Sequence, residues 1–158
     1  MKWFAFPAAL LVFATTAAFA DTLPDQVRAE ASRLLEQVNG MKVVASSRPA
    51  LKPAALSQVL VIDLQRFGMS ASRLSLEIDK TGGPTDLRCI FRGMAEETDV
   101  QLKAASNAAT GAQQAVALDR LSHMLQDAVE IAPAVGSQTK TAANPKVAAA
   151  TCPAVRDF

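Results

Sequence analysis

Hydrophobic residues recur every three or four positions along most of the chain, with polar residues between them. This spacing places the hydrophobic side chains on one face of an α-helix, which has about 3.6 residues per turn. The pattern runs through four segments, and short stretches rich in Gly, Pro, Ser or Asn separate them. Four amphipathic segments with short connections predict an all-α, up-and-down four-helix bundle.

The first segment starts after Thr22, a typical N-cap residue that is followed three positions later by Asp25. Its hydrophobic positions are Val27, Ala31, Leu34, Leu35, Val38 and Met41. Gly40 destabilises a helix interior by about 1 kcal/mol. The helix is therefore expected either to end near Gly40 or to continue, strained, to about Ala45, and the sequence Ser-Ser-Arg-Pro at 46–49 predicts a linker.

The second segment has the longest hydrophobic stripe, and Pro53 fits its first turn. The stripe consists of Leu56, Leu60, Leu64, Phe67, Ala71, Leu74 and Ile78. Residues 59–62 are Val-Leu-Val-Ile and are apolar around much of the helix, so we expect them to be the most buried part. This helix also has more apolar surface than one core stripe requires. Gly-Gly-Pro at 82–84 predicts its end.

Caps and breaks also bound the third and fourth segments. Thr85 can cap the third helix, which is expected to break near Asn107. Thr110 and Gln113 have the spacing of a capping box at the start of the fourth helix, and Pro133 is expected to end it. The hydrophobic positions are Leu87, Ile90, Phe91, Met94, Thr98, Leu102 and Ala105, and then Ala117, Leu118, Leu121, Met124, Leu125, Ala128 and Ile131.

Residues 72–92 allow a second interpretation. Hydrophobic residues alternate with polar ones on both sides of Gly-Gly-Pro, as in a β-hairpin. The alternating residues are Leu74, Leu76 and Ile78, followed by Leu87, Cys89 and Phe91. We favour a helix–turn–helix because the helical stripe runs unbroken from Leu56 and because Ala, Glu, Leu and Arg are frequent.

The N-terminal residues 1–20 have the pattern of a cleavable signal peptide. Lys2 precedes an apolar run, and small residues at positions 18 and 20 match a signal-peptidase site before Asp21. The run is shorter than the roughly 20 residues of a membrane span. We expect export to the periplasm, or secretion, with residues 21–132 forming the bundle and residues 133–158 an extended tail rich in Ala, Pro and Thr.

Cleavage at this site would change the composition of the chain. The single Trp is Trp3, the chain has no Tyr, and only Phe67, Phe91 and Phe158 would remain of the seven Phe. Without Lys2, the basic residues equal the 15 acidic ones in number. This balance and the few aromatic rings argue against nucleic acid as a partner, and no integral membrane segment is expected after residue 20.

The two cysteines, Cys89 and Cys152, form an even pair in a chain expected in an oxidising compartment. Such a pair predicts a disulfide rather than a metal site. Cys89 lies about 160° around its helix from Phe91, on the side away from the core. The disulfide would therefore tie the tail back to the outer side of the third helix.

Four residues are candidate contacts for a ligand or partner. Arg88 and Arg92 lie one turn apart, and Glu96 lies one turn further along. Two guanidinium groups on one face could bind a small anion or carboxylate, although an Arg92–Glu96 surface pair is the simpler explanation. Asp63 lies among apolar residues. It would need an Arg partner if it faced inward, but we expect it at the solvated edge.

Little in the sequence indicates catalysis. His123 is the only histidine and is expected to face solvent, and neither a metal site nor a cofactor motif is present, so we expect no cofactor. We therefore expect a small exported interaction protein without catalytic activity, such as an envelope adaptor, accessory or chaperone-like factor. Its partner would be another envelope protein or a second copy of the chain. The alternative is a periplasmic domain that binds or senses a small ligand.

Overall fold

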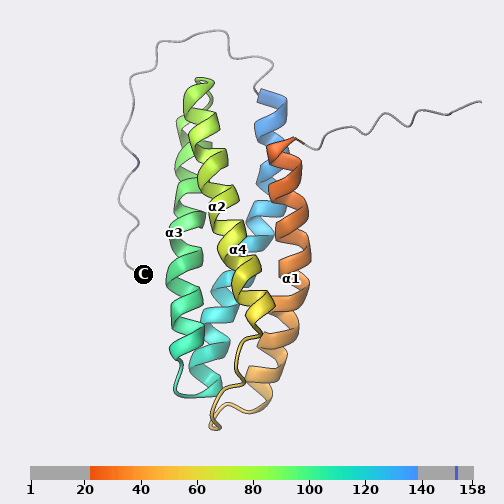
Figure 1. Ribbon diagram of the computed structural model, residues 1–158, viewed down its shortest axis with the longest axis vertical. Coiled ribbons are helices and arrows are strands. Elements are labelled where there is room, and N and C mark those ends of the chain that lie inside the picture. The colour runs from red at the N-terminus through yellow and green to blue at the C-terminus, as the bar shows by residue number, and fades with distance from the viewer. Residues whose placement is uncertain (1–21, 139–151, 153–158) are drawn as a thin grey trace, which may run out of the picture.

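The fold is known from a computed structural model, which describes residues 22–138 and residue 152. Four helices make up almost all of this part of the chain: α1 (Leu23–Ser47), α2 (Gln58–Lys80), α3 (Thr85–Asn107) and α4 (Gly111–Gln138). They run alternately down and up, and each packs against its neighbours in the bundle (Figure 1). The predicted all-α, up-and-down four-helix bundle is confirmed. The expected signal peptide and most of the tail lie outside the described residues.

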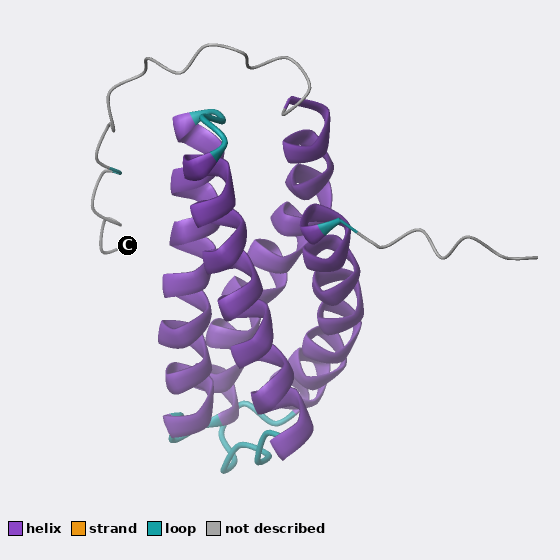
Figure 2. Ribbon diagram, turned by 45° about the horizontal axis from the view of Figure 1, so that its top comes forward, coloured by secondary structure: helices purple, strands orange, loops and turns teal. Residues whose placement is uncertain are grey.

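The helices associate most closely in two pairs. α1 packs mainly against α4, and α2 packs mainly against α3, whereas the contact between α1 and α2 is the smallest of the neighbouring contacts. Figure 2 shows the α1–α4 pair and the α2–α3 pair as the two sides of the bundle. Gly68 lies where α2 approaches α3, with the side chain of Thr98 beside it. α2 is thus supported from one side more than from the other.

The core lies between the four helices and is formed by the predicted stripes. The two aromatic residues Phe67 and Phe91 are fully buried in it. The largest buried aliphatic side chains around them are Val27, Leu34, Val38, Leu64, Leu74, Ile78, Leu118, Leu121 and Leu125. Burial of apolar area at about 25 cal/mol per Å² makes these contacts the main source of stability.

The turn between α2 and α3 is a helix C-cap of the Schellman type. Gly82 has a φ of 69°, which a glycine adopts without strain, and its amide donates to the carbonyl of Asp79. The amide of Gly83 donates to the carbonyl of Ile78 over 2.8 Å. Residues 72–92 are therefore a helix–turn–helix, and the β-hairpin alternative is wrong.

Several predicted helix boundaries differ from the observed ones. α1 continues past Gly40 to Ser47. α2 begins at Gln58, with Ser57 as its N-cap, rather than near Pro53. Thr85 is the first residue of α3 and makes no side-chain cap, since Pro84 holds the N-cap position. One half of the predicted capping box of α4 is present, because the backbone N–H of Gln113 donates to the Thr110 hydroxyl over 3.3 Å. The side-chain oxygen of Gln113 accepts from the backbone N–H of Ala109 over 2.9 Å, one residue before the cap, and not from that of Thr110.

α4 does not end at Pro133, as expected, but continues to Gln138. Proline removes one backbone hydrogen bond from a helix interior. Ala132 and Val135, on either side of it, are both buried against the core, so packing holds the last turns in place. The bundle therefore extends six residues beyond the expected boundary at 132, and the helical part of the expected tail belongs to it.

The residues between α1 and α2 pack against the beginning of α4. The carbonyls of Leu51 and Pro49 accept from the amides of Gly111 and Ala112 over 2.9 and 3.0 Å. The buried Gln114 side chain donates to the carbonyl of Ala54 over 2.8 Å. These bonds satisfy amides that a helix N-terminus otherwise leaves unpaired. They also explain why residues 53–57 are not helical.

Candidate functional site

α2 has a second hydrophobic stripe on the side opposite the core. Ile62, Met69 and Leu76 each follow a buried stripe residue by two positions, which is about 200° around the helix. Their side chains are 38%, 61% and 57% exposed. Val59, one turn before Ile62, is 65% exposed. Residues 59–62, expected to be the most buried part of the helix, therefore have two of their four side chains in solvent.

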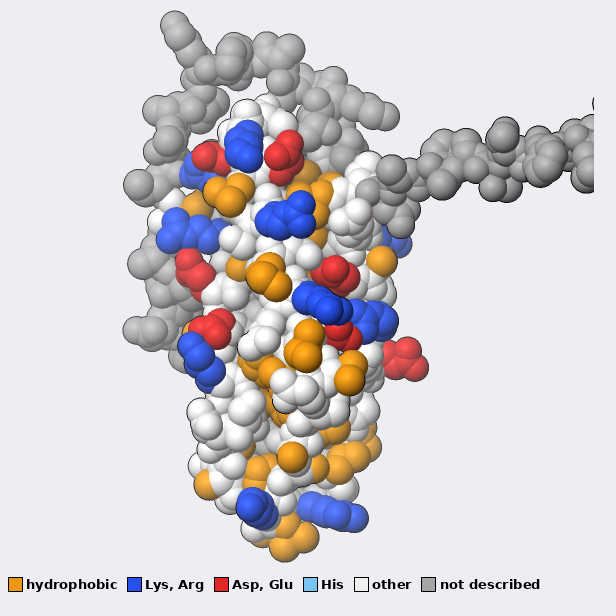
Figure 3. Space-filling model, in the orientation of Figure 1, with side chains coloured by type: hydrophobic (Ala, Val, Ile, Leu, Met, Phe, Trp, Pro, Cys, Tyr) orange, Lys and Arg blue, Asp and Glu red, His pale blue; other side chains and the backbone are white. Residues whose placement is uncertain are grey.

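Basic residues alternate with this stripe. Arg66, Arg73 and Lys80 are also spaced by seven residues and share the exposed side of α2. Figure 3 shows hydrophobic and basic side chains following one another down the face of the molecule that α2 forms. We call this surface the α2 outer face and define it as Val59, Ile62, Arg66, Met69, Arg73, Leu76 and Lys80.

Asp63 anchors one edge of the α2 outer face. It is buried, and its carboxylate accepts from the Arg33 guanidinium of α1 at 2.5 Å and lies 3.5 Å from that of Arg66. The expectation that Asp63 lies at a solvated edge was wrong. Asp63 instead faces inward, where a buried carboxylate needs a partner such as an Arg. The ion pair joins α1 to α2, the neighbouring helices with the smallest contact.

The other two basic residues of this face are not neutralised within the bundle. Neither Arg73 nor Lys80 forms an ion pair with another described residue. Glu77, one turn from Arg73, is the nearest acidic side chain along this side of α2. The face can therefore contribute apolar contacts and hydrogen bonds to an anionic group at the same time.

The structure gives Arg88 and Arg92, the candidate anion contacts, separate partners. Arg92 is paired with Glu96 over 2.9 Å, which is the simpler explanation given above. Arg88 turns the other way and pairs with Asp79 of α2, and its side chain is only 14% exposed. The two guanidinium groups therefore serve different contacts.

The predicted disulfide between Cys89 and Cys152 is present, with the two Cα atoms 5.3 Å apart. Cys89 is half-buried on α3, so the bond brings residue 152 to the outer side of that helix. The neighbouring surface of α3 carries charges that pair along the helix. Lys103 binds Asp99 at 2.5 Å, in the same way that Arg92 binds Glu96. Such pairs between residues one turn apart are usual on a helix surface that faces solvent.

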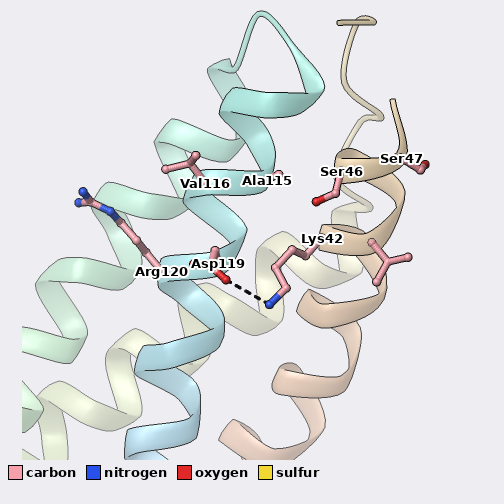
Figure 4. Close-up of a pocket in the computed structure, with 8 residues that line it drawn as sticks. Lys42, Ser46, Ser47, Ala115, Val116, Asp119 and Arg120 are labelled. Carbon is pink, nitrogen blue, oxygen red and sulfur yellow. Dashed lines mark hydrogen bonds and ion pairs between the residues drawn. The ribbon is translucent and has the colours of Figure 1, made fainter. Parts of the chain in front are cut away.

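A shallow open groove runs between α1 and α4 (Figure 4). Lys42 and Asp119 form an ion pair of 3.2 Å across it. Arg120 points away from the groove, whereas Val43 and Val116 flank it. His123, as predicted, is exposed on α4, and its Nε2 lies 3.7 Å from Asp119. The groove could take a small polar molecule, but its charges already satisfy one another.

The remaining chemistry of the described residues is sparse. No three His, Cys, Asp or Glu side chains among them are placed to hold a metal ion. Within residues 22–138, no helix has a stretch long and apolar enough to cross a bilayer. Met94 and Met124 are buried in the core, as expected, and the Thr98 hydroxyl donates to the Met94 carbonyl over 2.7 Å.

The sequence interpretation noticed the excess apolar surface of α2 but not the residues that form the outer face. The signal was a second seven-residue repeat, offset by two positions from the buried repeat of Leu60, Phe67 and Leu74. Comparison of the chain with protein-family models, with curated proteins and with solved structures finds no match.

Proposed function

We propose that this protein is an exported, non-catalytic interaction protein that binds another envelope protein through the α2 outer face. The observation that carries the proposal is the exposure of Ile62, Met69 and Leu76 at seven-residue intervals. A solvent-facing helix surface normally carries polar residues at such positions. Contiguous apolar side chains rimmed by charge are typical of protein-binding surfaces.

The expected export of the protein also supports this proposal. The apolar run of residues 1–20 with small residues before Asp21 fits a signal peptide, and a disulfide fits an oxidising compartment. An adaptor or accessory factor of the envelope needs a stable scaffold and one binding surface. The four-helix bundle is such a scaffold, and the α2 outer face is such a surface.

Position-specific photo-cross-linking in the periplasm of the host tests this proposal. A photoreactive amino acid at Met69 samples the α2 outer face, and one at Val100 of α3 is a matched control because that side chain is 53% exposed. We expect a discrete cross-linked protein from position 69 only. Equal cross-linking from both positions, or none from position 69, contradicts the proposal.

A second candidate function is the binding of a small ligand in the groove between α1 and α4. It is supported by Val43 and Val116, which line the groove near the Lys42–Asp119 ion pair. Its test is native mass spectrometry of protein taken from the host. An added small mass that disappears in Lys42→Ala and Val116→Asp supports this candidate, and an unliganded mass counts against it.

A further inference from the structure

We infer that the partner contributes an acidic amphipathic helix to the α2 outer face. The inference rests on the proposed function and specifies the chemistry of the partner. It is carried by charge complementarity: three basic side chains, Arg66, Arg73 and Lys80, lie beside the apolar stripe. The acidic residues near them are Asp63, which is buried and takes its shorter contact from Arg33, and Glu77. A surface of this composition selects a partner with apolar residues and carboxylates in the same alternation.

The spacing of the face specifies a helix as the partner's form. Seven residues are two helical turns, so the apolar row of Ile62, Met69 and Leu76 rises straight along α2 and matches the row of a second helix. The basic row runs beside it at the same interval. A helix with apolar residues every seven positions and glutamates one turn away can satisfy both rows, as the seam and flanking charges of a coiled coil do.

The basic side chains are placed to make these contacts. Arg66 already touches the buried Asp63, which takes its shorter contact, 2.5 Å, from Arg33. The Arg66 guanidinium therefore keeps donors for a second carboxylate, since it has five N–H groups. Arg73 and Lys80 form no ion pair with another described residue, so a partner's carboxylates displace no existing bond there.

A second copy of this chain fits the face less well. Two α2 helices packed through their outer faces would bring Arg66, Arg73 and Lys80 of one copy beside the same residues of the other. Like charges at such distances oppose association. Glu77 is the only acidic residue on this exposed side of α2, and its one carboxylate cannot balance the three basic side chains of each copy.

An anionic bilayer also fits less well. A helix that lies in a membrane surface separates a continuous apolar face from a basic face. In α2, the basic row lies only about 40° around the helix from the apolar row, so the basic and apolar residues do not form two separate faces. The apolar row also contains no aromatic residue. The alternation suits a partner whose own surface alternates.

Binding of synthetic peptides to the folded, disulfide-bonded chain tests the inference. One helical peptide of about three heptads carries leucine at seven-residue spacing with glutamate beside it, and its twin carries lysine in place of glutamate. Fluorescence anisotropy is expected to show that the glutamate peptide binds at least about tenfold more tightly, with an affinity that falls as salt is raised.

A charge reversal separates this result from loss of folding. The double variant Arg73→Glu and Lys80→Glu is expected to release the glutamate peptide and to bind the lysine peptide, which an unfolded chain could not do. Lys103→Glu on α3 is the control and should change neither affinity. Equal binding of both peptides overturns the inference, because apolar contact alone then explains it.

Other outcomes also overturn it. Binding of phosphatidylglycerol vesicles without binding of the glutamate peptide would assign the face to a membrane surface, and a dimer in native mass spectrometry that Met69→Glu dissolves would assign it to a second copy. If neither peptide binds while cross-linking from position 69 persists, the acidic helix is wrong and the proposed interaction function stands.

Discussion

The outer sides of α2 and α3 belong to neighbouring helices of one bundle but are built in opposite ways. On α3, the charged residues are one turn apart and pair with one another, as Arg92 does with Glu96 and Lys103 with Asp99. On α2, the outer side holds exposed apolar residues and two basic residues, Arg73 and Lys80, that form no ion pair with another described residue. The charged side chains of the α3 surface already pair with one another in water. On the α2 surface, by contrast, covering the exposed apolar side chains would be favourable.

The comparison shows that exposure alone does not identify a binding surface. Val100 of α3 is about as exposed as Leu76 of α2, but the other exposed hydrophobic residue of α3, Ile90, lies ten residues away and about 80° around the helix, so the two do not form a row. Isolated apolar residues on a surface are common and need no explanation. A row with seven-residue spacing and charge of one sign is different, because each of its members can contact the same partner helix.

The largest expected effect contrasts the two sides of α2 itself. Phe67 is fully buried, so Phe67→Ala should lower the free energy of unfolding by about 3–5 kcal/mol. Met69 is two residues away on the outer face, and Met69→Ala should change it by less than about 0.5 kcal/mol. Urea denaturation followed by circular dichroism measures both. A cost for Met69→Ala that approached that of Phe67→Ala would place Met69 in the core and remove the outer face.

The next effect concerns the tether on the α3 side. Cys152→Ser opens a loop of more than 60 residues. The loop-entropy treatment predicts that this lowers the free energy of unfolding by up to about 4 kcal/mol. Cys152→Ser and Cys89→Ser should lower the melting temperature equally, because both variants remove the same disulfide bond. Neither should affect binding at the α2 outer face. Melting temperatures that differ greatly between the two variants would show that the cysteines do not act as a pair.

A smaller effect is expected at the edge where α1 meets α2. Asp63→Asn removes the charge that binds Arg33 and Arg66, and hydrogen bonds to charged groups contribute about 1.5–3 kcal/mol. Because both arginines reach solvent, we expect a loss near the lower end of that range. Denaturation of Asp63→Asn beside Asp99→Asn, an exposed aspartate of α3, measures it. An equal and negligible loss in both variants would mean that Asp63 does not join the helices.

The smallest effect lies on the α3 surface. Lys103→Ala removes an exposed pair with Asp99 and should cost a few tenths of a kcal/mol, a loss that high salt should reduce. Arg73→Gln on α2 should not destabilise the bundle, since Arg73 has no ion pair with a described residue to lose. Thermal melts at low and high salt compare the two. A larger loss for Arg73→Gln would show that the outer face contributes to folding rather than to binding.

Local features of the sequence were enough to predict the bundle. The stripes through Phe67 and Phe91, the Gly-Gly-Pro turn and the Thr110 N-cap depend on residues close together in the chain, and all are observed. The disulfide followed from the number of cysteines and the expected compartment. These signals need no knowledge of how the helices are arranged.

The features that the sequence did not predict depend on contacts between distant residues. Asp63 is buried because Arg33, thirty residues earlier, reaches it from another helix. α4 passes Pro133 because its flanking residues pack on the core. The start of α2 is delayed because the preceding residues bind the beginning of α4 instead. The outer face itself is defined by what does not pack against it, which periodicity alone cannot show.

If the α2 outer face is the partner surface, the native mass of the protein isolated from its host tests this most directly. We expect a complex with another protein for the wild type and for Val100→Glu, and an uncomplexed chain for Met69→Glu. Detection should not rely on absorbance at the ultraviolet wavelengths of Trp and Tyr, because residues 21–158 contain neither. A complex that persists in Met69→Glu would contradict a partner surface on α2. Equal loss of the complex in Val100→Glu would contradict it as well.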